Sequence, residues 1–245
     1  MKRLRPLSPR SSQLSTAPAL TGRQSVGRLP ALPSRAISAS TTPNRLSTLR
    51  LVPAPSRVLG FDLENRPLAY WYPGETTAEI TAFGWKWTDE PDAHVLVLKR
   101  DGAFVSDDGR RFPPHKAYSF LRELVASAGL VFGHNIRRHD LPLLQAGLLR
   151  LGLEPLPVLL TTDTLSDYPK RRSMSASLEN LAAMYGLDGE KLHMSQVSWE
   201  RANRLRPDGI ELARERVVSD VLLQERLRER LLQLGVLGAP RRWLP

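Results

Sequence analysis

Hydrophobic and polar positions show no regular spacing over residues 1–56, and a regular pattern begins at residue 57. Eight prolines fall within the first stretch, where they would interrupt any helix. Serine, proline and arginine are abundant there, and such a composition lacks the apolar surface that ordered packing requires. We therefore predict a disordered tail over residues 1–56 and one folded domain over residues 57–240.

In the folded part, short apolar runs alternate with segments whose apolar residues have helical spacing. Turn dipeptides such as Pro73-Gly74 and Asp101-Gly102 separate the early runs, which predicts three antiparallel strands. Strands followed by alternating helices and strands are typical of a mixed α/β layer fold. We expect strands over residues 57–63, 78–87, 94–99, 130–133 and 158–161, and helices over residues 117–128, 141–151, 177–185 and 210–234.

The net charge of +10 is confined to the start of the chain. Residues 1–57 hold ten basic residues and no acidic one, since the first carboxylate is Asp62. The remaining 188 residues hold 25 of the 35 basic residues and all 25 acidic ones, so the folded part is neutral.

The basic tail has three possible interpretations. It is an electrostatic arm that contacts nucleic-acid phosphates, an organellar transit peptide, or an extension without a role, including one from a wrongly assigned start. We expect a protein of the cytoplasm of a bacterial or phage-infected cell, or an organellar protein if the tail is a transit peptide.

Composition excludes several classes of protein and of site. No segment reaches the 18 or so uninterrupted apolar residues of a membrane span, and no apolar stretch follows the charged start as in a secretory signal. The chain has no cysteine, so thiolate metal sites, disulfides and cysteine nucleophiles are excluded. Any metal must bind to oxygen or imidazole ligands.

Two carboxylates occur at the end of the first predicted strand. Asp62 and Glu64 are two residues apart and so project from one face, whereas Phe61 and Leu63 project from the other. At about 4 Å and an effective dielectric constant near 20 their repulsion is about 4 kcal/mol, so a cation must compensate it. The alternative is an exposed strand end at which both groups are solvated.

Two further carboxylates occur at comparable positions. Asp140 follows a buried strand at the start of a helix, and there its negative charge would also interact favourably with the helix dipole. Asp220 lies in the last helix among apolar neighbours, and its alternative role is a solvated helix face or a pair with Arg216. If these carboxylates converge in the fold, they form a hard-oxygen site suited to Mg²⁺ or Mn²⁺.

Other residues near these carboxylates have competing interpretations. Asn65 could contact a terminal nucleotide and Asn135 could tie the strand to the helix through side-chain bonds to backbone, and ordinary turn chemistry explains either residue equally well. Asp163 is interpreted as a helix cap rather than a carboxylate that supports the site. Trp85 and Trp87 share a strand face, where core packing is favoured over base stacking.

Taken in order, these elements resemble the three exonuclease motifs of the DEDD superfamily of RNase H-like proofreading exonucleases. Asp62 and Glu64 match the first motif, residues 135–140 the second, and Asp220 the third. Residues 162–165 and 177–182 are similar to the intervening segments of predicted phage and bacterial exonucleases. The resemblance implies an RNase H-like mixed sheet with antiparallel first strands, flanked by helices.

The resemblance also implies the chemistry. Two Mg²⁺ or Mn²⁺ ions would bind to Asp62, Glu64, Asp140 and Asp220, with Asp62 bridging both, and hydrolyse phosphodiesters from the 3′ end of DNA or RNA to nucleoside 5′-monophosphates. Asn65 and Asn135 would contact the substrate. The expected partners are single-stranded nucleic acid or 3′ ends and a replication or repair protein, with no membrane.

The sequence departs from the superfamily pattern at two places. His139 replaces the usual Phe or Tyr of the second motif. Arg216 and Glu215 occupy the positions at which active members carry Tyr or His to activate the attacking water. The alternatives are therefore a catalytically weakened or inactive nucleic-acid-binding module and an RNase H-like endonuclease.

Overall fold

A computed structural model describes residues 57–70, 78–169, 175–187 and 192–245. These residues belong to one unit of the chain, and the tail predicted over residues 1–56 lies outside them. Within the described residues, eight strands form one sheet in the order β5-β4-β3-β2-β1-β6-β7-β8. The strands are β1 (Val58–Pro67), β2 (Ala78–Trp87), β3 (His94–Leu98), β4 (Phe104–Ser106), β5 (Arg111–Phe112), β6 (Leu130–Gly133), β7 (Leu159–Asp163) and β8 (Arg241–Trp243).

β1 lies in the middle of the sheet and changes its direction of pairing. It is antiparallel to β2 on one side and parallel to β6 on the other. The parallel partner is reached through a helix, as a crossover connection requires, whereas β1 to β5 follow one another as antiparallel neighbours. The predicted α/β fold class, a mixed sheet with antiparallel first strands flanked by helices, is confirmed.

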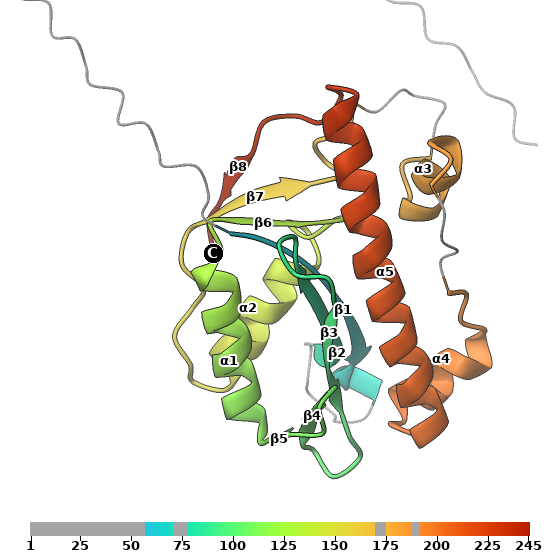
Figure 1. Ribbon diagram of the computed structural model, residues 1–245. Coiled ribbons are helices and arrows are strands. Elements are labelled where there is room, and N and C mark those ends of the chain that lie inside the picture. The colour runs from blue at the N-terminus through green and yellow to red at the C-terminus, as the bar shows by residue number, and fades with distance from the viewer. Residues whose placement is uncertain (1–56, 71–77, 170–174, 188–191) are drawn as a thin grey trace, which may run out of the picture. The chain divides into compact units, whose positions relative to one another are not determined.

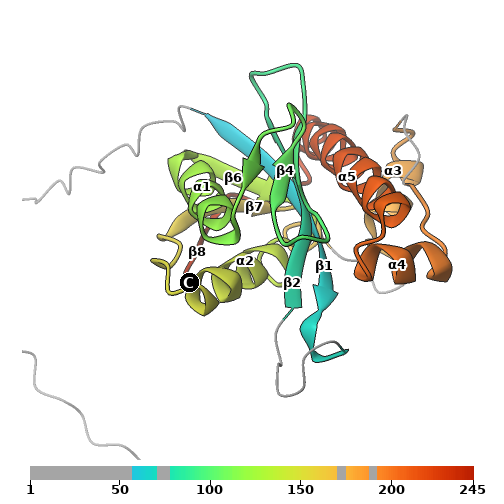
Figure 2. The same ribbon diagram turned by 90° about the horizontal axis from the view of Figure 1, so that it is seen from below.

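Helices cover both faces of the sheet (Figures 1 and 2). α1 and α2 lie on one side of the strands, and the long α5, with α3 and α4 beside it, lies on the other. The described helices are α1 (Pro114–Ser127), α2 (Asp140–Arg150), α3 (Leu178–Met184), α4 (Gln196–Asn203) and α5 (Pro207–Gln233), with a 3-10 turn η1 (Leu68–Tyr70) after β1. No helix in the described part has the length and apolar character needed to cross a bilayer.

Successive side chains of β1 point alternately into the hydrophobic core and toward the face that carries the carboxylates. Phe61 and Leu63 are buried in the main hydrophobic cluster, whereas Asp62 and Glu64 are only partly buried. Gly84 is the register partner of Asp62, and a Cβ there would lie 3.1 Å from the Val217 carbonyl oxygen. The absence of a side chain at Gly84 therefore lets α5 pack closely on the sheet beside Asp62.

The structure also contains elements that the pattern did not predict. β4, β5, α4 and β8 are each between two and eight residues long, too short for a periodicity to be recognised. β8 lies beyond residue 240, the predicted limit of the domain, and pairs with β7. Trp85 and Trp87 are each 7% exposed and belong to the core cluster, as expected.

Candidate metal centre

The first two carboxylates lie where β1 extends beyond its parallel neighbour. β6 pairs with β1 only at residues 58–60, because β6 ends at Gly133. On the other side β1 remains paired with β2 as far as Pro67, with a register shift between Glu64 and Asn65. At Asp62 and Glu64, the edge of β1 that faces away from β2 therefore has no paired strand and is open to the segment that follows β6.

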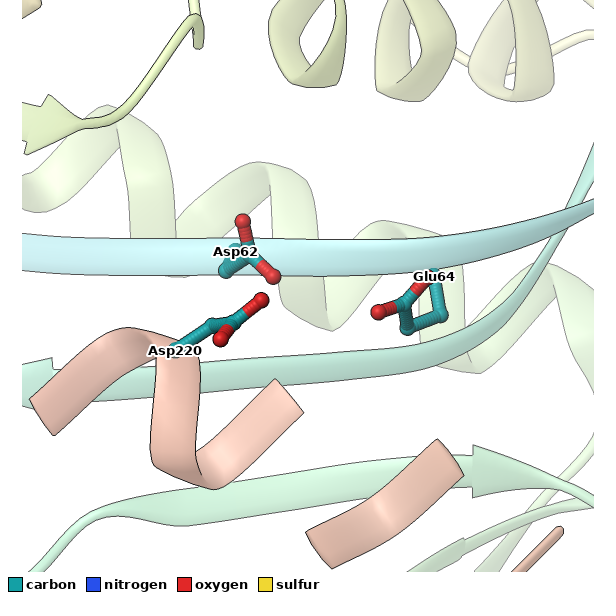
Figure 3. A group of neighbouring side chains, drawn as sticks. All are labelled: Asp62, Glu64 and Asp220. Carbon is teal, nitrogen blue, oxygen red and sulfur yellow. The ribbon is translucent and has the colours of Figure 1, made fainter. Parts of the chain in front are cut away.

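α5 brings a third carboxylate to this position. Carboxylate oxygens of Asp62, Glu64 and Asp220 all lie within 4.8 Å of one another. Figure 3 shows the side chain of Asp220 extending from its helix toward Asp62, with the carboxylate of Glu64 turned toward both. Asp220 is 3% exposed, so a solvated helix face is the wrong interpretation of this residue. The structure therefore brings together three of the four predicted ligands.

Asp140, the fourth predicted ligand, lies beside this group without belonging to it. It opens α2, is 2% exposed, and its Oδ1 accepts a hydrogen bond of 3.2 Å from the Leu63 backbone N–H. Leu63 lies beyond the residues of β1 that pair with β6. Its N–H is therefore bound by the Asp140 side chain and not by a carbonyl group of a neighbouring strand. Asp140 thereby ties the start of α2 to the residue between Asp62 and Glu64.

The negative charges at the site act on one another. Burial raises the pKa of Asp62 well above its usual value, and the charges of Asp140, Asp220 and Glu64 raise it further, while the hydrogen bond from Gln224 acts in the opposite direction. Burial also raises the pKa of Asp140, against the effect of neighbouring His139. In return, the hydrogen bond to Asp140 raises the pKa of His139. The carboxylates of the centre therefore disfavour one another's ionisation.

We expect the metal-free protein to lose stability as the pH rises from about 4, the unfolded value for Asp. A carboxyl whose pKa is raised by folding binds its proton more tightly in the native state, so its contribution is lost as pH rises through the native pKa. His139 acts in the same direction at higher pH. Urea unfolding in EDTA at several pH values checks this, and Asp62→Asn should flatten the curve. An unchanged slope in that variant would contradict the assignment to Asp62.

Gln224 is a neighbour of the site that the sequence analysis did not identify. Its Nε2 donates a hydrogen bond of 2.9 Å to Asp62 Oδ1, and the residue is 1% exposed. Its buried Oε1 accepts no hydrogen bond from the described residues. The spacing from Asp220 could have revealed it, because residues four apart share one face of a helix. Gln224 fixes the orientation of the Asp62 carboxylate from α5.

Arg216 supplies the cation that the repulsion at the strand end requires. Its Nε lies 2.6 Å from Glu64 Oε1, and one terminal nitrogen lies 3.6 Å from Asp220 Oδ2. The other terminal nitrogen donates to the Leu192 carbonyl at 2.6 Å, and the guanidinium lies 5.1 Å from the centre of the Trp199 ring. The i,i+4 pair between Arg216 and Asp220, the alternative interpretation of Asp220, is therefore present, and Arg216 also binds Glu64.

The loop after β6, which leads to Asp140, is held by buried charged groups. Asn135 has a left-handed backbone (φ 73°), a conformation that Asn tolerates better than most residues. Its N–H donates to Asp163 Oδ1 at 3.0 Å, and its carbonyl accepts from the N–H groups of Arg138 and His139. The tie predicted for the Asn135 side chain is thus made by its backbone, in the described part of the chain.

Asp163 is not the helix cap that was predicted. It ends β7, is fully buried, and the described residues that follow it form a turn. Its two oxygens accept backbone N–H groups from Asn135 and Arg137 across the sheet and from Leu165 and Ser166 in that turn. A carboxylate followed by polar residues fits a cap equally well in sequence, but here it joins the ends of two parallel strands.

A cavity of about 410 Å³ is lined by the sequence neighbours of two carboxylates, Asn65 next to Glu64 and His139 next to Asp140. Arg138 and His139 of the loop after β6 contribute polar groups to this cavity, and Pro142 and Leu143 of α2 contribute apolar surface. Asn65 and the second-motif segment therefore face one space.

Comparisons with known proteins find similarity among solved structures but not among sequences. No protein-family profile matches the sequence, and no curated protein matches it. Among solved structures, the chain is similar to the family B DNA polymerase from the hyperthermophilic archaeon Pyrobaculum calidifontis, with a TM-score of 0.49 and 17% sequence identity. The match covers 74% of this chain and 25% of that chain, so this chain spans about a quarter of the polymerase's length.

Proposed function

We propose that the chain is a metal-dependent 3′-5′ exonuclease that releases nucleoside 5′-monophosphates from DNA or RNA. The observation that carries the proposal is the convergence of Asp62, Glu64 and Asp220 within 4.8 Å at the end of β1. Like charges at this distance repel, and a buried or half-buried charge is costly unless it is paired or binds a cation. The order of the carboxylates along the chain is the one the DEDD resemblance predicts.

The donor set fits a hard divalent cation. All three groups offer carboxylate oxygens, and burial together with the charges of the neighbouring carboxylates raises the pKa of Asp62. Oxygen ligands without sulfur or imidazole suit Mg²⁺ or Mn²⁺. Asp62, Glu64 and Asp220 would hold the cations, with Asp140 at their side. When bound, such ions lower the pKa of a water molecule and stabilise the entering and leaving oxygens of a displacement at phosphorus.

The residues around the carboxylates have positioning roles in this proposal. Gln224 orients Asp62 from α5, and Arg216 holds Glu64 at 2.6 Å. Asp140 accepts the Leu63 N–H, which fixes the part of β1 that lies between the two carboxylates. The site is therefore assembled from rigid elements, a strand and two helices, which suits chemistry that depends on placing reacting groups accurately.

The cavity beside the carboxylates supports an exonuclease over an endonuclease. Asn65, Arg138 and His139 offer hydrogen-bond donors that suit the sugar and phosphate of a terminal nucleotide, and Pro142 and Leu143 offer apolar surface for its base. The comparison to make is between a linear single strand and a circular one of the same sequence. The proposal predicts cleavage of the linear strand alone, and equal cleavage of the circle would favour the endonuclease.

A second candidate, a nucleic-acid-binding module with weakened catalysis, is favoured by one observation. Arg216 binds two of the three carboxylates from the position at which active superfamily members carry Tyr. A guanidinium in this place competes with a divalent cation for Glu64. The strength of that competition decides between the two candidates.

We expect Arg216→Gln to tighten Mn²⁺ binding by about tenfold, because it removes a positive charge next to the ligands, worth roughly 1–2 kcal/mol at a half-buried site. Titration calorimetry of the full chain measures the change. Arg214→Gln is the matched control, since Arg214 is exposed on the same helix and pairs with Glu211. Weaker Mn²⁺ binding in Arg216→Gln would instead mean that Arg216 positions Glu64 for the ion.

A further inference from the structure

A second cavity, of about 540 Å³, lies at the amino end of α5 and is lined by arginines. Its lining residues come from the end of β1, the turn after β3 and the turn between α4 and α5. The residues that line it are Arg66, Arg100, Arg204, Arg206, Pro207 and Asp208.

The positive charge of this cavity is only partly balanced. Arg66 pairs with Glu79 at 2.7 Å and Arg204 with Glu200 at 2.9 Å. The one carboxylate in the lining, that of Asp208, lies 2.6 Å from an arginine outside it. Within the part of the chain that the structure describes, the guanidinium groups of Arg100 and Arg206 have neither a hydrogen bond nor an ion pair. Two guanidinium groups are thus available to an anion.

The turn that carries two of the arginines is fixed by the core. Leu205 has a left-handed backbone (φ 52°), which is strained for a branched side chain, and is 5% exposed in the main hydrophobic cluster. Its N–H bonds the Ala202 carbonyl, and the N–H of Arg206 bonds the Arg201 carbonyl, as in a helix-ending motif. The buried leucine therefore holds Arg204 and Arg206 on either side of it in a defined turn.

The cavity is connected to the carboxylates by two rigid elements. Arg66 follows Glu64 by two residues on β1, and Asp220 follows Pro207 by thirteen residues on α5. The cavity thus extends from Arg66, near Glu64, to the start of α5, which at 1.5 Å per residue lies about 20 Å from Asp220 along the helix axis. One strand of stacked nucleic acid places a phosphate about every 3.4 Å along its axis, so the α5 side of the cavity corresponds to a phosphate about six nucleotides from the carboxylates.

We propose that this arginine cavity binds backbone phosphates of the strand whose 3′ end lies at the carboxylates, several nucleotides upstream of the cleaved bond. The inference rests on the proposed function. Guanidinium groups match phosphate oxygens in geometry and charge, and contacts of this kind position a strand without reading its sequence. The cavity thus selects substrates longer than about six nucleotides.

The test compares strand lengths in a background that does not cut. Binding of a 5′-labelled trinucleotide and a dodecamer is measured by fluorescence anisotropy with full-length Asp62→Asn protein in EDTA. Adding Arg100→Gln and Arg206→Gln should weaken dodecamer binding by about tenfold and leave trinucleotide binding unchanged. Loss of two phosphate contacts should also lower the slope of log K against log salt concentration by about 1.4.

A control separates this cavity from the effect of net charge. Arg230→Gln with Arg242→Gln removes the same charge at the far end of α5 and at the other edge of the sheet, and dodecamer binding should be retained. Equal loss in the control, equal loss for both strand lengths, or no loss would overturn the proposal. If the parent protein cuts neither strand, the proposed function fails, while the length-dependent binding still decides for or against the cavity.

Discussion

Asp62→Asn should lower the rate of 3′-end hydrolysis by about a thousandfold or more and leave the melting temperature in EDTA unchanged or higher. The substitution keeps the side-chain volume and an oxygen for the hydrogen bond from Gln224, but it removes one of the three converging charges. Loss of a cation ligand removes several kcal/mol of transition-state stabilisation, which corresponds to such a factor in rate. In the metal-free protein the same change relieves repulsion, as the raised pKa of Asp62 indicates.

Single-turnover kinetics and thermal unfolding of the same samples check the two halves of this prediction. Asp92→Asn is the control, because Asp92 is an exposed carboxylate in the turn between β2 and β3. A large fall in the melting temperature of Asp62→Asn would assign Asp62 a structural role. Retained hydrolysis would remove it from the metal centre.

Arg137→Met should have the largest effect on stability, about 3 kcal/mol. Arg137 forms two parallel bonds to Asp167, of 2.6 and 2.8 Å, and also bonds the side chain and the carbonyl of Thr161. The Asp167 side chain is completely buried, so loss of its partner leaves a buried charge, which typically costs 3–5 kcal/mol. Arg241 remains 3.4 Å from Asp167, which places the cost at the lower end.

Urea unfolding measures this cost, and two variants make it specific. Arg111→Met breaks an exposed pair with Asp101 and should cost less than about 1 kcal/mol. Adding Asp167→Leu to Arg137→Met should recover part of the loss by removing the unpaired charge. If Arg137→Met costs no more than Arg111→Met, the buried pair does not hold the loop that leads to Asp140.

The sequence predicted the part of the site that depends on short spacings. The alternation of Phe61, Asp62, Leu63 and Glu64 correctly assigned two side chains to the core and two carboxylates to the opposite face, because the strand period of two is strict. Asp220 was predicted from its apolar neighbours on a long helix, for which the helical period is reliable.

The parts that could not be predicted depend on contacts between distant residues. Arg137 and Asp167 lie 30 residues apart, and each is an ordinary polar residue of a loop until the fold brings them together. The same holds for Arg216, which pairs with Glu64 across 152 residues. β8 is three residues long, too short to show a periodic pattern of apolar residues. It pairs with the edge of β7 that no other strand occupies.

The most direct test of the account is a time course on a single-stranded oligonucleotide labelled at its 5′ end, with Mg²⁺, with Mn²⁺ and with EDTA, followed by addition of excess metal to the EDTA sample. The account predicts a ladder that shortens from the 3′ end with either metal, stops in EDTA, resumes on metal addition and is absent in Asp62→Asn. An intact strand under every condition, or equal cleavage in EDTA, would contradict it.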